Sequence, residues 1–218
     1  MKRLITSIAL ALLLCAASEA KLTVSSIFTD SMVLQQNTEA AIWGKADAGS
    51  QITVTTSWNG KSYRAKTDSD GRWEVKVTTP AGSYKPYSVT VKGNGGSITL
   101  NDVLIGEVWL ASGQSNMEMP MRGFYNSPVE HAQEYICAPA AKEKVRMFHV
   151  HVKQSYEPLE EVADSKWVGA EPSTVQWMSA TAYFFAKEVY ESTGVPVGLV
   201  NASWGGTPVE AWMSEEAL

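Results

Sequence analysis

The sequence predicts a two-part fold: a β-sandwich, followed by the first portion of an α/β domain with a parallel sheet. Residues 21–101 contain short alternating apolar and polar stretches separated by turn signals roughly every ten residues, as in antiparallel sandwiches. Beyond residue 101 the apolar runs become continuous, which is typical of strands buried on both faces. One segment of helical spacing lies between two such runs, and this order predicts a parallel sheet with a covering helix.

The first 20 residues have the features of a secretory signal peptide. Lys2 and Arg3 precede an apolar run over residues 4–17, and the small residues Ser18 and Ala20 follow where cleavage would occur. The run is shorter than the ~20 residues that span a bilayer. We therefore expect cleavage after Ala20 and export to the periplasm or the extracellular space. An uncleaved anchor and a lipoprotein modification at Cys15 are the alternatives, and no later segment predicts a membrane span.

The composition narrows the classes of partner. The formal net charge is −5 and no run of Lys and Arg forms a basic stripe, so nucleic-acid binding is not expected. Eight tryptophans are suited to stacking on sugars, although a core position is the commoner role for any one of them. After cleavage Cys137 would have no partner for an internal disulfide, and its apolar neighbour Ile136 predicts a buried, unreactive thiol.

The predicted strands of the first part follow one another with tight turns between them. Asn59-Gly60 is a strong hairpin signal, and residues 68–71 and 93–96 mark two further turns. No His, Cys or carboxylate cluster in this part has the pattern of a functional site, so we interpret it as a scaffold or a sugar-facing accessory module. The expected strands cover residues 51–56, 64–67, 73–77, 87–91 and 98–100.

The second part, residues 102–218, begins with a strand over residues 108–111 that leads into a small-residue turn containing Ser115. Apolar residues then recur at helical spacing over residues 180–192, before Gly194 and Pro196 end the helix. A second apolar strand, residues 197–200, leads into the loop of Gly205 and Gly206. Ligands of open α/β sheets bind at the carboxyl ends of the strands, so these two loops form the candidate site.

Ser115 has part of the setting that a hydroxyl nucleophile requires. Such a nucleophile needs an exposed position on a tight turn, a base for its proton and donors for the oxyanion. Gly113 permits the tight turn, whereas Met117 departs from the Gly-x-Ser-x-Gly elbow of α/β-hydrolases. From the residues alone, an ordinary turn serine is a better interpretation than a nucleophile.

Two blocks of sequence resemble one esterase family. Residues 106–117 (GEVWLASGQSNM) resemble the first block of the sialate O-acetylesterase branch of the SGNH hydrolases, and residues 200–212 (VNASWGGTPVEAW) resemble the second. Residues 70–73 (DGRW) are similar to a turn found in the β-sandwich that precedes these blocks in the family. The resemblance implies a β-sandwich followed by an SGNH-type α/β/α domain, of which this chain holds an incomplete first portion.

The resemblance also implies a chemistry for the site. The family removes O-acetyl groups from sugars, notably O-acetylated sialic acid, through an acetyl-enzyme formed on the serine that corresponds to Ser115. The backbone N–H of Ser115 and that of either Gly205 or Gly206 would bind the oxyanion. Gln114, Asn116 and Trp204 would contact the substrate, although Asn116 is equally suited to a turn role. The implied partner is an O-acetylated sugar or glycan, with no cofactor and no metal.

The chain departs from the family in what it lacks. The family's Trp-Tyr-Gln-Gly-Glu-like block and its final Asp-x-x-His, which carries the base, are absent, and none of His131, His149 and His151 has Asp three residues before it. His149 and His151 fall on one face of an expected strand over residues 147–152, but without a third metal ligand. We expect His131 to be a surface residue.

These absences predict that the chain is the front part of a longer esterase, or the product of a broken reading frame, and lacks the catalytic His. Fewer residues follow Asn101 than the family's sheet requires. The alternatives are a non-catalytic carbohydrate-binding remnant, or an esterase of acetylated xylan or another plant polysaccharide with the same mechanism.

Overall fold

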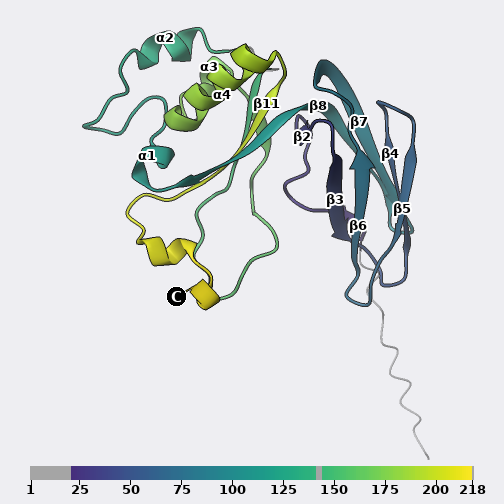
Figure 1. The fold of residues 1–218 in the computed structure, drawn as a ribbon. Helices are drawn as coiled ribbons and strands as arrows, with labels where there is room; N and C mark the ends of the chain where they lie inside the picture. Colours follow the sequence, from purple (N-terminus) through teal and green to yellow (C-terminus); the bar gives the residue numbers. More distant parts are fainter. Residues whose placement is uncertain (1–20, 141–143, 218) are drawn as a thin grey trace, which may run out of the picture.

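The computed structural model describes residues 21–140 and 144–217, so the predicted signal peptide at residues 1–20 lies outside the described residues. A three-stranded antiparallel sheet has the order β1-β3-β6, and a larger mixed sheet has the order β10-β9-β11-β8-β7-β4-β5, with β2 paired to β8 (Figure 1). The strands are β1 (Thr23–Val24), β2 (Val33–Gln35), β3 (Glu39–Lys45), β4 (Gln51–Thr56), β5 (Ser62–Lys66), β6 (Arg72–Thr78), β7 (Ser83–Gly93), β8 (Gly96–Gly113), β9 (Val145–His149), β10 (Trp167–Gly169) and β11 (Val197–Ser203). The helices are α1 (Ser115–Glu118), α2 (Ala132–Cys137), α3 (Pro172–Val175), α4 (Ala180–Thr193) and the 3-10 turns Val209–Trp212 and Glu215–Ala217.

The alternating segments of the first part form strands because one side of each strand is buried. In β6 the buried residues Trp73, Val75 and Val77 alternate with exposed polar ones. These side chains share one hydrophobic core with buried residues of β4 and β7, such as Ile52 and Val89. The three-stranded sheet and part of the large sheet are therefore held together by a common core.

One strand, β8, enters both parts of the chain. Its first half pairs antiparallel with β7, and its second half pairs in parallel with β11 (Figure 1). The boundary that the sequence suggests at residues 101–102 thus falls inside a continuous strand, at Asp102, whose φ is 54°. A rigid backbone element, rather than a linker, connects the sheet of the first part to the candidate site.

The parallel pairing expected for the second part is present. β11 lies between β8 and β9 and runs parallel to both, while β10 is an antiparallel edge strand. A second core joins this sheet to α4, with Leu199 of β11 packed in the same cluster as Tyr183 and Ala186. α4 starts where the Ser179 hydroxyl accepts the Ala182 N–H and ends at Gly194, whose φ is 72°. None of the described helices is both long and apolar enough to cross a membrane.

The expectation of a buried Cys137 is wrong. Cys137 is exposed at the end of α2, where its sulfur accepts a hydrogen bond from the Gln133 amide at 3.1 Å. α2 contains no fully buried residue, and Ile136 is only partly buried against the second core. Because successive helical side chains point about 100° apart, the residue after Ile136 turns towards solvent.

Arg146 of β9 connects the two parts through a buried guanidinium. Its side chain is 4% exposed and forms two 3.0 Å hydrogen bonds with the Asp102 carboxylate, together with one to the Ser31 carbonyl at 2.9 Å. Both bonds to the Asp102 carboxylate come from Nη2, and charge-assisted hydrogen bonds of this kind are stronger than those between neutral groups.

We expect Arg146→Met to lower the free energy of unfolding by about 2–3 kcal/mol, somewhat less than for a fully buried pair, because the Asp102 side chain is half exposed to water. Urea denaturation followed by circular dichroism measures this. Arg64→Met, which alters an exposed arginine of β5, is the control and should change stability by less than about 0.5 kcal/mol. Equal effects of the two variants would contradict the role assigned to Arg146.

Candidate functional site

The candidate site lies where three parallel strands end at the same edge of the sheet. The last residue of β11, Ser203, pairs with Gly113, the last residue of β8. Asn201 of β11 pairs on its other side with His149, the last residue of β9. The Trp204 N–H donates to the Gly113 carbonyl at 3.0 Å and extends the pairing by one residue. The expectation that the two glycine-containing loops leave the sheet at one edge is confirmed.

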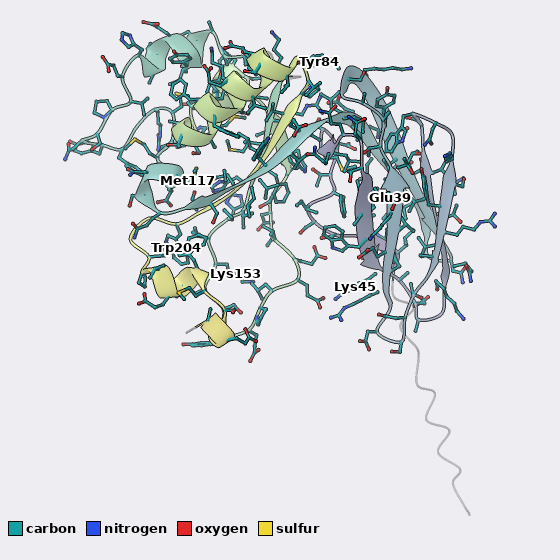
Figure 2. All side chains as sticks on the ribbon, viewed as in Figure 1. Glu39, Lys45, Tyr84, Met117, Lys153 and Trp204 are labelled. Atoms are coloured by element: carbon teal, nitrogen blue, oxygen red, sulfur yellow. The ribbon has the colours of Figure 1, made fainter. Side chains whose placement is uncertain are left out.

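Ser115 is the first residue of α1 and is exposed to solvent. Gly113 has a φ of 147°, a conformation that side-chain-bearing residues rarely adopt, and it turns the chain abruptly out of β8. The short helix is fixed to α4, since the Thr181 hydroxyl donates to the Asn116 carbonyl at 2.8 Å. Figure 2 labels Met117 in this helix. A glycine turn and a helix contact therefore hold Ser115 in an exposed position.

The two blocks meet at Gly205. A Cβ atom placed on Gly205 would lie 3.2 Å from Ser115 Oγ and 2.5 Å from Glu118 Oε2. The backbone of this loop therefore approaches the Ser115 hydroxyl as closely as only a glycine allows. Gly206 has a φ of 78° and has no atom within 4 Å of the equivalent position. The structure thus brings together Ser115 and the glycine pair, as their placement after parallel strands predicts.

Glu118 is a site residue that the sequence interpretation missed. Its Oε2 accepts the Gly205 N–H at 2.7 Å, so this backbone donor is already occupied. Glu118 is the fourth residue of α1, and one helical turn places it on the same side of the helix as Ser115. The position of Glu118 three residues after Ser115 is the signal that could have found it.

The three residues expected to contact substrate occupy different places. The Gln114 amide donates to the Thr207 carbonyl and so ties the two loops to each other. Asn116 is exposed, and Trp204 is partly buried in the wall of a cavity. Thr207 closes the turn around Trp204 by donating its hydroxyl to the Trp204 carbonyl at 2.7 Å. Gln114 therefore has a structural contact, while Asn116 and Trp204 remain accessible.

A cavity of about 1260 Å³ adjoins the glycine turn. One wall is the end of β11 with the loop after it, residues 202–208, and Trp212; the other is formed by residues 150–155, 159 and 161–164 of the chain after β9. Figure 2 marks these two walls by Trp204 and Lys153. Ser115 does not line the cavity itself but is separated from it by Gly205. The cavity is large enough for a sugar ring and its substituents.

His149 also lies at this edge of the sheet, where the sequence predicts only a strand face that it shares with His151. Strand β9 ends at His149, so the predicted continuation to residue 152 is wrong; the Val150 N–H makes the ladder hydrogen bond to the Asn201 carbonyl that forms the His149–Asn201 pair. His149 Nδ1 lies 3.1 Å from Asn201 Oδ1, and the rings of His149 and His151 are 5.1 Å apart. His131 is exposed, as expected. Residues 21–140 and 144–217 contain no group of three or more side chains suited to hold a metal ion.

Burial lowers the pKa of His149 below its ordinary value of 6.5; the nearby His151 also lowers it, and the hydrogen bond to Asn201 and the charge of Glu118 oppose this. Asn201 Oδ1 already accepts the Ser203 hydroxyl, so it acts as an acceptor and His149 Nδ1 carries the proton. The other ring nitrogen, Nε2, then holds a lone pair. His149 is therefore a neutral imidazole at the carboxyl edge of the sheet, on a strand separated by β11 from the strand that leads to Ser115.

We expect the lowered pKa to make the native state less stable in mild acid. In the unfolded chain His149 takes up its proton as the pH falls through 6.5. The folded chain takes it up only at lower pH, so stability is lost between these two values. Unfolding free energies measured in this pH window should fall less for His149→Gln than for the unmodified protein. Parallel pH profiles would contradict the burial of a neutral imidazole.

Comparisons with known proteins agree on one family. A family model described as "Carbohydrate esterase, sialic acid-specific acetylesterase" matches residues 105–218. Sialate O-acetylesterase of Rattus norvegicus is 33% identical over 210 residues, covering 89% of this chain and 38% of the relative, and that of Homo sapiens is 32% identical over 212 residues, covering 89% and 39%. A crystal structure described as a novel carbohydrate acetylesterase from Xanthomonas citri superimposes with a TM-score of 0.82 at 35% identity, covering 89% of this chain and 43% of that chain.

The mixed sheet with few helices thus has the fold of a solved carbohydrate acetylesterase. The chain spans about two fifths of the length of the curated relatives that it matches. Ser115, Gly205, Gly206 and Glu118 all lie within the region matched by the family model.

Proposed function

Because the chain belongs to the family of sialic acid-specific acetylesterases, a group of carbohydrate esterases, we propose that it forms the nucleophile-bearing part of a serine esterase. The enzyme removes O-acetyl groups from carbohydrates, with O-acetylated sialic acid as its substrate. The observation that carries this proposal is the close approach of the Gly205 backbone to Ser115 Oγ at the shared edge of the parallel sheet. A hydroxyl nucleophile beside a backbone turn is the arrangement that acyl transfer requires.

In the proposed reaction Ser115 Oγ bonds to the acetyl carbon and transfers its proton to a base. The sugar hydroxyl leaves with a proton, and water then hydrolyses the acetyl-enzyme to acetate. The Ser115 N–H and the Gly206 N–H are the proposed oxyanion donors, since the Gly205 N–H is bound to Glu118. Gly205 becomes a donor if Glu118 moves away on substrate binding. Asn116 and Trp204 contact the sugar from either side of the turn.

We propose that the general base lies in the portion of the relatives' length that this chain does not cover. Under this proposal residues 21–101 are a β-sandwich accessory domain, and residues 102–218 are the first portion of an SGNH-type α/β/α domain. Residues 1–20 direct export to the periplasm or the extracellular space before cleavage near Ala20.

The test is acetate release by the full-length protein from O-acetylated sialic acid and, in parallel, from acetylated xylan. Release from the sialic acid with little from xylan supports the proposal. Preference for xylan would move the substrate to plant polysaccharides. Binding of either sugar without any acetate release would favour a carbohydrate-binding remnant.

A further inference from the structure

The chain between β9 and β10, residues 150–166, forms one wall of the cavity and has no regular secondary structure. Residues 151–161 are all exposed, so packing against a core does not hold them. At its start, the Val150 N–H donates to the Asn201 carbonyl at 2.8 Å, and after its end the Trp167 indole donates to the Ile27 carbonyl at 2.8 Å. The shape of the cavity therefore depends on what holds residues 151–166 in place between Val150 and Trp167.

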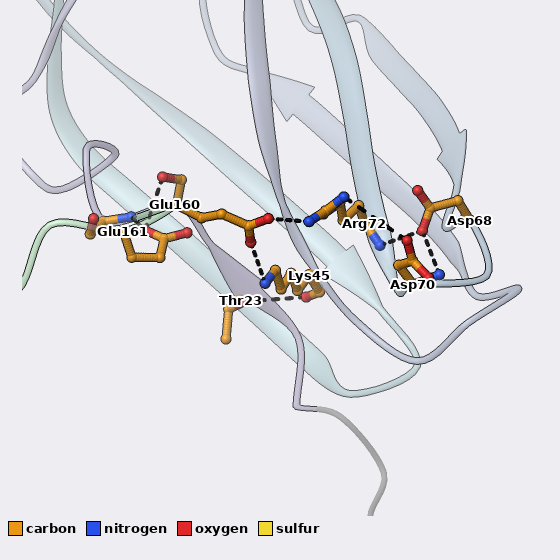
Figure 3. A network of polar contacts seen from close by, with 9 residues as sticks. Thr23, Lys45, Asp68, Asp70, Arg72, Glu160 and Glu161 are labelled. Atoms are coloured by element: carbon orange, nitrogen blue, oxygen red, sulfur yellow. Dashed lines mark hydrogen bonds and ion pairs between the residues drawn. The ribbon is translucent and has the colours of Figure 1, made fainter. Parts of the chain in front are cut away.

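Glu160 binds two cations that come from different strands of the three-stranded sheet. Its Oε2 lies 2.6 Å from Lys45 Nζ of β3, and its Oε1 accepts a hydrogen bond from Arg72 of β6 (Figure 3). The hydrogen bond from Lys45, together with the charges of Arg72 and Lys45, lowers the pKa of Glu160 below its ordinary value, so this carboxyl is ionised near neutral pH. Isolated exposed ion pairs contribute little, but a network with two cations fixes a position more strongly.

The next two residues, Glu161 and Val162, add hydrogen bonds to the chain directly after β1. Glu161 Oε2 accepts the Ser26 N–H at 2.7 Å and the buried Ser25 hydroxyl at 3.0 Å. The Val162 N–H donates to the Ser26 hydroxyl at 2.9 Å. Three consecutive residues, 160–162, at the end of the exposed stretch, are therefore bound to the N-terminal part of the chain.

We propose that Glu160 and Glu161 are positioning residues for the substrate: they hold the 150–166 connection on the N-terminal part, and thereby set the width of the cavity beside the glycine turn. The consequence for substrate choice rests on the proposed esterase function. A sugar that fills the cavity touches both walls, whereas an ester as small as p-nitrophenyl acetate needs only the region of Ser115. The N-terminal part of the chain is then a determinant of affinity for large substrates, although its strands do not carry the nucleophile.

The double variant Glu160→Gln, Glu161→Gln tests this in the full-length protein. Hydrogen exchange of the Ser26 and Val162 amides, which donate hydrogen bonds at this network, is expected to become about fivefold faster, because loss of the network frees them. KM for O-acetylated sialic acid is expected to rise about fivefold at nearly constant kcat, and kcat/KM for p-nitrophenyl acetate to stay within about twofold. Glu157→Gln is the control, because it removes one carboxylate of the same kind from the same connection but outside the network.

Lys45→Gln removes one partner from the opposite side and should reproduce the direction of both changes. Unchanged exchange in the double variant would overturn the proposal, and so would faster exchange with an unchanged KM for the sugar. If the unmodified protein hydrolyses neither ester, the proposed function fails. The exchange measurement then decides by itself whether Glu160 and Glu161 hold the connection. Far-UV circular dichroism checks that each variant is folded.

Discussion

Ser115→Ala is expected to reduce kcat/KM for acetyl ester hydrolysis by the full-length protein by about a thousandfold or more, the scale found when a nucleophile is removed. The Ser115 hydroxyl oxygen is the atom that accepts the acetyl group in the proposed reaction, so no neighbouring hydrogen-bond donor can do its work. Stability should change by less than about 0.5 kcal/mol, because Ser115 is exposed and alanine is a good helix former. Hydrolysis of p-nitrophenyl acetate and thermal unfolding measure the two effects.

Ser112→Ala is the matched control for this variant. Ser112 is also exposed and lies three residues earlier, at the end of β8 before the glycine turn. It should keep nearly full activity. A serine-directed phosphonate reagent should label Ser115 in the unmodified protein, and peptide mass spectrometry locates the label. Activity that survives Ser115→Ala, or a label on another serine, would remove Ser115 from the role of nucleophile.

The features of the fold that the sequence predicts are those encoded locally. The alternation in residues 73–77 places Trp73, Val75 and Val77 on one side, and the structure buries that side. The helix over residues 180–192 is predicted within one residue of its observed end, because helical spacing and Gly194 both act locally. The meeting of Ser115 and Gly205 is also predictable, since parallel strands bring their carboxyl ends to one edge.

The features that the sequence does not predict depend on pairing between distant residues. The change in composition near residue 101 indicates a domain boundary, but β8 continues through it because its two halves pair with different strands. The contact of Glu118 with Gly205 joins residues 87 positions apart. The sequence around His149 predicts only a strand face shared with His151, and it is the register with Asn201 that places His149 at the candidate site.

The effect of a side chain at Gly205 is the second large prediction. We expect Gly205→Ala to reduce kcat/KM by about a hundredfold, the scale of a small displacement of a catalytic group. The new methyl would lie 3.2 Å from Ser115 Oγ and 2.5 Å from Glu118 Oε2, so at least one of these side chains must move. Kinetics with p-nitrophenyl acetate measure the loss. Gly60→Ala is the control for a glycine substitution as such, because Gly60 has a φ of 66° in a distant turn with no atom nearby; it should cost about 1–2 kcal/mol of stability and leave activity intact.

The stability of Gly205→Ala should differ from that of the control. Gly205 does not have a positive φ, so alanine fits its backbone, and the gain from a less flexible unfolded chain offsets the loss of the hydrogen bond to Glu118. The unfolding free energy is therefore expected to stay within about 1 kcal/mol while activity falls. Adding Glu118→Ala removes the atom closest to the new methyl, whereas the close contact between the methyl and Ser115 Oγ remains. Recovery of activity in this double variant would assign the loss to the displaced Glu118 carboxylate, and continued loss would assign it to Ser115. Full activity of Gly205→Ala itself would contradict the close approach of the two blocks, on which the proposed site depends.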